Sequence, residues 1–334
     1  MEKLQFVLFQ LDESKRYILA GSVPALRVAL LLLDNAVEVL LDRWIADDLD
    51  SDEMSEIIQR RAREAGIPED HPHFVDLYQQ RFLTASEKKR VARLFDEKLR
   101  YVTELKGLVA PSMSAVLSHL HRYRNDAHHS GRVRTQTLHT SVVILFSLCC
   151  ALVELLKPGS SGYASTEDYS WLKEKFDLTP GALWDKRAIS SVLESLREGL
   201  PIDDGTIGET FAQNIEGRIE ALEEGLRFIS TETHVAPSMS EALVASQKFS
   251  LAEQKRAQPY RISPPSLDAP VSLQLIEQFR SVPLQVREAT DALAAFQTFA
   301  TADTGLERLE FMVNSLVVAI DSEIQMAVDQ VRGK

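Results

Sequence analysis

The chain has 334 residues and a formal net charge of −12 at pH 7, and 45% of its residues are apolar. This length suits two domains of ordinary size, and the apolar fraction allows each domain to bury a core. The negative charge argues against broad adhesion to DNA or to an anionic membrane surface, because both depend on clustered lysine and arginine. A locally basic groove is still compatible with it.

The ends and the most apolar stretches give no sign of export or membrane insertion. Residues 1–12 alternate apolar and polar side chains without a basic head or a cleavage site, so we predict no signal peptide. The apolar runs 28–33 and 140–153 are shorter than the roughly 20 residues that span a bilayer. Cys149 and Cys150 are typical of small buried thiols in a reducing compartment. We therefore expect a cytoplasmic protein with no membrane segment.

Strand signals are weak, and apolar residues recur at helical spacing in most segments. We therefore predict an all-α fold, with helices over residues 23–45, 86–107, 111–129, 135–157, 180–200, 207–232, 238–258, 273–300 and 307–331. A short exposed helix is also expected within residues 47–63. Three pairs with capping-box spacing favour helix starts, namely Thr206 with Glu209, Ser238 with Glu241, and Thr304 with Glu307.

The segment Pro158-Gly159-Ser160-Ser161-Gly162 has the composition of a linker. It predicts a helical bundle over residues 1–157 and a second helical region over residues 158–334. The task of the second region is open between regulation, partner binding and dimerisation. Its last helix has an apolar stripe that suits packing in a bundle or against a second copy, made of Leu309, Met312, Val313, Leu316, Ile320, Ile324 and Val328.

Histidine and arginine concentrate near the end of the helix expected over residues 111–129, in a chain that is otherwise acidic. Half of the 8 histidines lie there, and the whole group is His119, His121, His128, His129, Arg122, Arg124, Arg132 and Arg134. Ser130 and Gly131 form a helix stop signal. Side chains near this stop can project into one open space.

These residue types suit the cleavage of RNA by attack of a 2′-hydroxyl on the neighbouring phosphate. A base must remove the hydroxyl proton, charge develops on the phosphoryl oxygens, and the leaving 5′-oxygen needs a proton. Histidine suits the proton transfers, and arginine suits bidentate stabilisation of the phosphoryl group. Asn125 can orient the imidazole or the phosphate through its amide. The scheme requires no metal and no cofactor.

The string Arg124-Asn125-Asp126-Ala127-His128-His129 is similar to the Arg-Asn-x-x-x-His motif of HEPN domains. The resemblance covers residues 19–157, with a long apolar first helix and an apolar helix after the motif. HEPN domains are helical bundles, and many are metal-independent endoribonucleases of toxin–antitoxin, antiphage or RNA-processing systems. They usually dimerise, so that two motifs face one cleft. The resemblance implies that Arg124 and His129 are catalytic, with Asn125 as the polar residue beside the arginine.

Three other residues in or next to the motif are also candidates for the site. His128 lies one helical turn from Arg124, so it is an alternative to His129 as the active histidine. Asp126 and Arg122 are supporting candidates. A structural interpretation also exists, in which cationic side chains stabilise the carboxyl end of a helix through its dipole.

Four residues outside the motif are candidates with two interpretations each. Arg132 and Arg134 are predicted to bind RNA phosphate, or else to be ordinary surface residues. Asp34 and Glu38 lie on the polar stripe of the first long helix, where they are predicted to orient the cationic site from behind. Their alternative is a solvent-facing groove. No metal site is predicted, because His71 and His73 flank a proline in a loop without an obvious third ligand.

Two functions remain open from the sequence. The leading one is a homodimeric metal-independent endoribonuclease acting on RNA in a toxin–antitoxin or antiphage setting, with an antitoxin or another protein as its regulator. The rival is a non-catalytic HEPN-like module that dimerises and binds a protein or nucleotide partner. The second helical region is further predicted to restrain the nuclease until a signal arrives.

Overall fold

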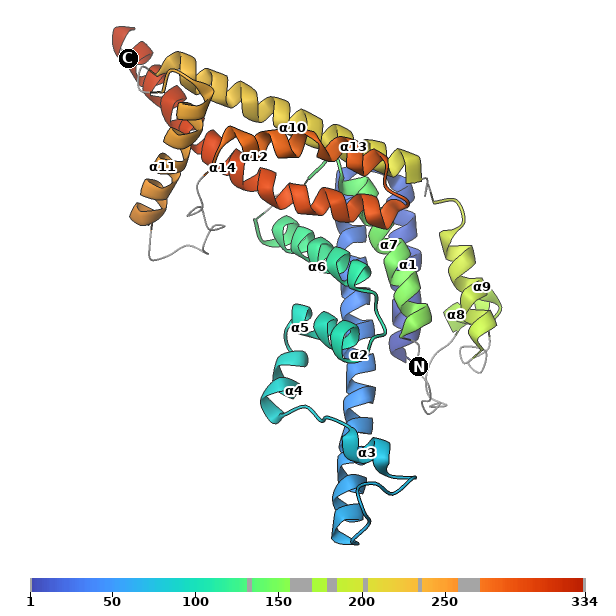
Figure 1. Cartoon of the computed structure of the whole chain (residues 1–334). Coiled ribbons are helices and arrows are strands. Elements are labelled where there is room, and N and C mark those ends of the chain that lie inside the picture. The colour runs from blue at the N-terminus through green and yellow to red at the C-terminus, as the bar shows by residue number, and fades with distance from the viewer. Residues whose placement is uncertain are drawn as a thin grey trace. The chain divides into compact units, whose positions relative to one another are not determined.

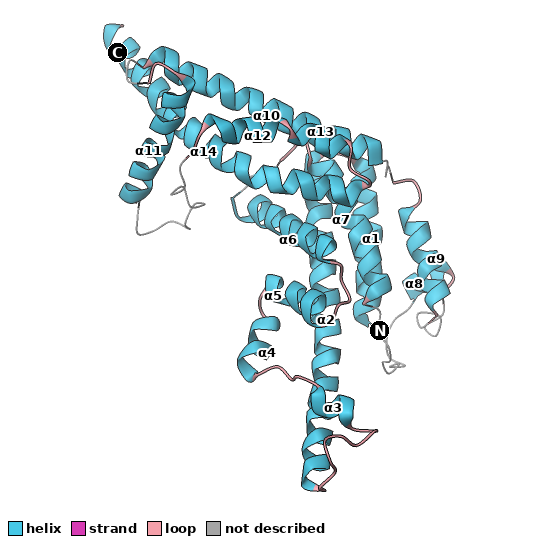
Figure 2. Cartoon of the chain, in the orientation of Figure 1, coloured by secondary structure: helices cyan, strands magenta, loops and turns pink. Residues whose placement is uncertain are grey.

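The computed structural model describes residues 2–130, 134–156, 170–178, 185–200, 204–233, 236–257 and 271–332. Every regular element in these ranges is a helix, as Figure 2 shows. The predicted all-α fold class is therefore confirmed. The chain divides into two compact units, Met1–Ile202 and Asp203–Lys334.

The core of unit 1 is built by three helices that pack together, α1 (Glu2–Ala20), α2 (Val23–Glu64) and α7 (Leu138–Leu155) (Figure 1). Gly21 separates α1 from α2 with a positive φ of 66°, which glycine adopts without strain. The hydroxyl of Ser22 then caps α2 by accepting from the Ala25 amide at 3.4 Å. The sequence analysis did not predict α1. The apolar face of α1 is covered mainly by α2 and α7, which local sequence patterns do not reveal.

α2 is one helix of 42 residues, so the predicted end near residue 45 is wrong. Neither proline nor glycine interrupts it before Gly66, and the polar residues 47–63 continue the same helix. Tertiary contacts hold its second half. The Gln59 amide donates to the Leu77 carbonyl at 2.8 Å, and the Gln80 amide donates to Asp52 at 2.9 Å.

The single helix predicted over residues 86–107 is three pieces, and a further short helix precedes them. The elements from α3 to η2 are α3 (Val75–Gln79), α4 (Ala85–Val91), α5 (Phe95–Arg100), the π-helix η1 (Tyr101–Leu105), α6 (Pro111–Asn125) and the π-helix η2 (Asp126–Ser130). Thr84 and Glu87 form a capping box at α4 that the sequence analysis missed. Burial raises the pKa of Tyr101, whose hydroxyl donates to Asp48 at 2.6 Å.

Two further helices complete unit 1, α8 (Ser170–Phe176) and α9 (Lys186–Arg197). α9 contacts α7 and α1, and its Leu193 is fully buried. Trp171 on α8 packs edge-on against Phe9 with ring centroids 5.5 Å apart. The two units therefore divide further along the chain than the predicted boundary after residue 157. The predicted linker, Pro158–Gly162, lies outside the described residues.

Cys149 and Cys150 lie side by side in the buried face of α7 as free thiols. Burial raises the pKa of Cys149 well above its usual range and that of Cys150 to about 12. Since the thiolate is the reactive form, both residues are inert packing groups.

Unit 2 consists of α10 (Asp204–Glu232), α11 (Met239–Ala257), α12 (Leu273–Arg280), α13 (Val282–Arg287) and α14 (Ala292–Val331) (Figure 1). Phe211 on α10 stacks on Phe299 of α14 at 4.4 Å between ring centroids, within a buried aromatic cluster. The Arg218 guanidinium donates to Asp303 at 2.5 Å and to Glu310 at 2.7 Å. The same two helices are thus joined by an apolar cluster and an ion-pair network.

The region from residue 273 to residue 331 was predicted to form two helices, 273–300 and 307–331, and these boundaries are wrong. Two short helices end at Arg287, and α14 then begins at Ala292 and runs through Glu307. Asp291 starts α14, because its carboxylate accepts from the Ala294 amide at 2.8 Å. Thr304 is inside the helix, where its hydroxyl donates to the Ala300 carbonyl.

Of the other two predicted capping boxes, one lies at a helix start. Ser238 accepts from the Glu241 amide at 3.3 Å, and α11 begins at Met239, so this start is confirmed. Thr206 instead lies inside α10, which begins at Asp204. A serine or threonine three residues before a glutamate also occurs within helices, so the spacing alone does not fix a start.

Among the helices that the structure describes, two are long and apolar enough to cross a membrane by length and composition, α7 and α14. α7 is a core helix of unit 1, because 72% of its apolar window is buried. Only 11% of the apolar window of α14 is buried, although the amino-terminal half of the helix buries Phe296, Phe299 and Leu306 within unit 2. Core helices of globular proteins meet the same criterion of length and composition.

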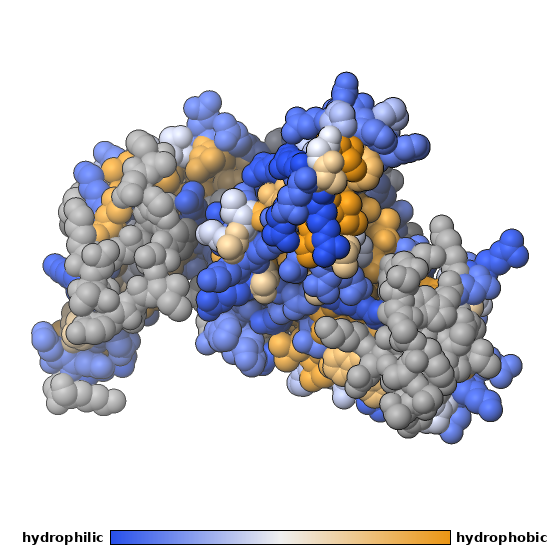
Figure 3. Space-filling model, turned by 90° about the horizontal axis from the view of Figure 1, so that it is seen from below, coloured by the Kyte–Doolittle hydropathy of each residue, from blue (hydrophilic) through white to orange (hydrophobic). Residues whose placement is uncertain are grey.

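Apolar side chains also reach the surface. On the face shown in Figure 3, apolar patches lie between hydrophilic side chains. On α2, Met54 and Ile58 lie one helical turn apart and are 59% and 44% exposed. Single exposed apolar residues are ordinary on globular proteins, where they need no partner.

Candidate functional site

The site forms where α6 packs on α2. Pro111 begins α6, where its missing N–H costs nothing, and one face of the helix buries Val116 and Leu120 in unit 1. His121 and Arg124 are three residues apart, so they share another face, which meets the polar stripe of α2. The contacts join residues about 90 positions apart in the sequence.

The guanidinium of Arg124 is held by three partners. Nε donates to Asp34 Oδ2 at 2.5 Å, Nη2 donates to Glu38 Oε1 at 2.6 Å, and Nη1 donates to Asn125 Oδ1 at 2.8 Å. Asp34 is buried at 2% side-chain exposure, whereas Glu38 is 31% and Arg124 is 20% exposed. Charge-assisted bonds of this length fix the orientation of the guanidinium plane.

The Arg124 side chain keeps hydrogen-bonding capacity in spite of these partners. A guanidinium carries five N–H donors, two on each terminal nitrogen and one on Nε. The contacts above use one donor on each nitrogen. One N–H of Nη1 and one of Nη2 are therefore left for a further acceptor, such as a phosphate oxygen.

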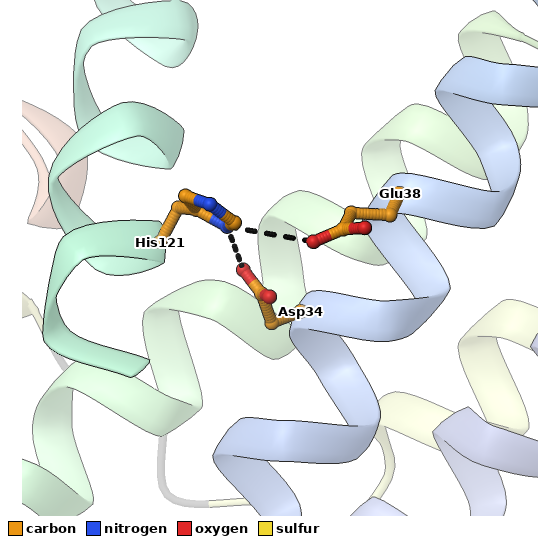
Figure 4. A group of neighbouring side chains, drawn as sticks. All are labelled: Asp34, Glu38 and His121. Atoms are coloured by element: carbon orange, nitrogen blue, oxygen red, sulfur yellow. Dashed lines mark hydrogen bonds and ion pairs between the residues drawn. The ribbon is translucent and has the colours of Figure 1, made fainter. Parts of the chain in front are cut away.

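His121 belongs to the same cluster. Its Nδ1 lies 2.9 Å from Asp34 Oδ1 and 3.7 Å from Glu38 Oε1, as Figure 4 shows. The Phe95 ring on α5 stacks on the imidazole with centroids 3.9 Å apart and planes 10° apart. His121 was not among the residues predicted from the sequence to form the site. The available signal was its spacing of three residues from Arg124.

A π-helical turn follows Arg124 and Asn125. The helix predicted to continue to residue 129 is α-helical only to Asn125, and η2 then covers Asp126–Ser130. The Ala127 carbonyl accepts from Arg27 Nη2 at 2.9 Å, which ties the turn to α2. π-turns interrupt the α-helical register and are frequent at functional sites.

This turn exposes the two histidines of the motif. His128 and His129 are both exposed, with ring centroids 4.9 Å apart. Among the described contacts, neither ring is hydrogen-bonded to Arg124. Both imidazoles are therefore accessible to solvent.

The supporting candidates have other partners. Arg122 contacts the His119 ring of its own helix at 2.8 Å. Arg134 donates to Asp126 at 3.2 Å, and its guanidinium lies 4.0 Å from the centre of the Tyr123 ring. Both residues of the Asp126–Arg134 pair are only partly exposed, and the pair joins Arg134 to η2. Arg132 lies outside the described residues.

One group of side chains has the spacing of metal ligands. The donor atoms of Asp34, Glu38 and His121 all lie within 4.8 Å of one another. The guanidinium of Arg124, however, already contacts both carboxylates and supplies the opposing positive charge. For this reason we assign no metal to the cluster.

The backbone amide of His73 donates to the ring of His71 at 3.3 Å, a local contact within their loop.

Comparisons of the chain with protein-family models, with curated proteins and with solved structures find no match.

Proposed function

We propose that this protein is a metal-independent endoribonuclease of the HEPN type. The observation that carries the proposal is the setting of Arg124. Two carboxylates and Asn125 fix its guanidinium at the end of α6, and the next turn exposes His129. The site thus combines an oriented phosphate-binding group with an exposed proton-transfer group on neighbouring turns.

Each motif residue has a chemical task in this proposal. Arg124 binds the scissile phosphate through its two remaining N–H donors and stabilises the charge that develops on the phosphoryl oxygens. His129 transfers a proton, with His128 as its alternative. Asn125 keeps Arg124 in place. The products are a 2′,3′-cyclic phosphate and a 5′-hydroxyl.

The proposal extends to the assembly and its setting. A homodimer would bring two copies of the motif to one composite cleft, and the RNA would bind there. The setting is a toxin–antitoxin or antiphage system, with an antitoxin or another protein as the regulator. The acidic net charge is compatible with RNA binding, because binding in this scheme depends on a local cationic site.

The test is cleavage of total RNA by the purified protein in excess chelator. The wild type is expected to cut, and Arg124→Ala and His129→Ala are each expected to lower the rate by about 10² or more. The matched controls are Arg60→Ala and His73→Ala, which remove exposed residues of the same types from the same unit. Equal products from Arg124→Ala, His129→Ala and the wild type would contradict the proposal.

A second candidate function is a non-catalytic helical module that dimerises and binds a protein or nucleotide partner. The observation that favours it is the pairing of Arg124 with two carboxylates, which is also what a purely structural arginine would do. This module would bind its partner without cleaving RNA. An intact RNA pool after incubation with the wild type and its partner would support it.

A further inference from the structure

We infer that His121 is the general base of the proposed ribonuclease and takes the proton from the 2′-hydroxyl. The inference rests on the proposed function, since it assigns a role within that reaction. The reaction requires a base at the 2′-oxygen and an acid at the 5′-oxygen in the same step. One imidazole cannot fill both positions in the same step, and His121 is the imidazole that shares a carboxylate with Arg124.

Asp34 sets the orientation of the His121 imidazole. Its Oδ2 accepts from Arg124 Nε at 2.5 Å, while its Oδ1 faces His121 Nδ1 at 2.9 Å. A carboxylate is an acceptor, so the proton between the two residues belongs to Nδ1. In the neutral imidazole Nε2 then carries the lone pair, and it points away from Asp34 because the two nitrogens lie on opposite sides of the ring.

Three elements fix the ring in place. Asp34 and Glu38 face it from α2, Arg124 lies one turn further along α6, and Phe95 stacks on it from α5. The charged neighbour from α5 is Asp96, which accepts from Ser118 one turn before His121 on α6. The side chain is 17% exposed, which leaves it partly accessible.

The cluster differs from an ordinary packed histidine on the same helix. His119 is only 4% exposed, and its ring lies 4.7 Å from the Tyr123 ring. His121 instead shares one carboxylate with the proposed phosphate-binding arginine, so the proposed base and the phosphate contact are held by one side chain. A shared carboxylate holds the two groups in a fixed relative orientation, and such positioning favours the reaction.

The proposed step balances without a further reactant. His121 Nε2 takes the proton of the 2′-hydroxyl, and the 2′-oxygen forms a bond to phosphorus. The bond from phosphorus to the 5′-oxygen breaks, and the protonated imidazole of His129 gives its proton to that oxygen. Arg124 stabilises the charge that develops on the phosphoryl oxygens while the first bond forms and the second breaks.

The test uses the full-length protein, a fluorescent RNA oligonucleotide and excess chelator. His121→Asn keeps an amide N–H that can donate to Asp34 but lacks a basic ring nitrogen. Its kcat is expected to fall by about 10² to 10⁴ with little change in KM. The rise of kcat/KM with pH on the acid side, which reports the base, is expected to disappear. His119→Asn is the matched control.

The outcomes separate this inference from the proposed function. A wild type that cleaves RNA, with a folded His121→Asn of unchanged kcat and pH profile, would overturn the role of His121 and leave the ribonuclease standing. A wild type that does not cleave RNA under any tested condition would remove both. Circular dichroism establishes folding, and His121→Gln serves as the second variant if His121→Asn does not fold.

Discussion

At the scale of single residues, Asp34 determines the geometry of the candidate site. Its two oxygens hold Arg124 and His121 at once, although its own side chain is buried at 2% exposure. A buried carboxylate is costly to desolvate unless its lone pairs are satisfied, and here both oxygens have cationic or N–H partners. The site and the packing of α6 on α2 therefore depend on the same side chain.

We predict that Asp34→Asn lowers the free energy of unfolding by about 2 to 4 kcal/mol, because it removes the charge that pairs with a partly buried arginine. The new amide also places a donor beside N–H donors. Urea unfolding followed by circular dichroism measures the change. The control is Asp50→Asn, an exposed residue of the same helix, which is expected to stay within about 0.5 kcal/mol of the wild type. Equal midpoints for the two variants would show that the Asp34 contacts do not stabilise the fold.

At the scale of elements, the length of α2, the end of α6 and the contact of α10 with α14 each have a separate physical cause. α2 continues through a polar stretch because nothing in its backbone interrupts it, and α3 and its neighbours cover that stretch. α6 changes to a π-helical turn at Asp126, directly after the motif residues Arg124 and Asn125. The close approach of α10 to α14 is set by Gly225, where a Cβ atom would lie 2.8 Å from Val313 Cγ1.

Two glycines of α10 are expected to respond in opposite directions to the same substitution. Gly217→Ala should stabilise the protein by about 0.5 to 1 kcal/mol, because alanine is the better helix former and its Cβ would meet nothing within 4 Å. Gly225→Ala should destabilise it by about 1 to 3 kcal/mol, because the stiff Val313 side chain must shift. Thermal unfolding of both variants is the measurement. Stabilisation of both would mean that the α10–α14 contact is looser than described.

At the scale of the whole molecule, the chain forms two helical units with separate cores. α8 and α9 belong to the first unit, where Ile189 and Leu193 are buried and Trp171 packs on Phe9. A fragment that ends at the predicted linker would therefore lose part of the cover of unit 1. The proposed restraint of the nuclease by the second half is better tested by removing residues 203–334.

We expect the fragment 1–202 to be folded and more stable than the fragment 1–157, by several degrees in Tm. The physical reason is the apolar surface that α9 covers on α7 and α1. Differential scanning calorimetry of both fragments, beside the full chain, checks this. If the fragment 1–157 is as stable as the fragment 1–202, the boundary of the first domain lies near Pro158, as predicted from the sequence. RNA cleavage by a folded fragment 1–202 above that of the full chain would support the restraint.

The sequence by itself determined the features that depend on neighbouring residues. Helical periodicity predicted the all-α class, the apolar run around Cys149 and Cys150 predicted a buried helix, and Ser238 predicted the start of α11. The concentration of arginine and histidine before Gly131 identified the candidate site. Each of these signals lies within a few turns of chain, so no knowledge of packing is required to detect it.

Only the tertiary structure decided which distant residues meet. It brought Asp34 and Glu38 against Arg124, added His121 and Phe95 to the cluster, and assigned α9 to the first unit. It also decided that α1 is a helix and that α14 runs past Thr304, since both outcomes depend on apolar faces that other helices cover. Such contacts are selected by burial and charge pairing between segments far apart in the sequence, and local patterns do not encode them.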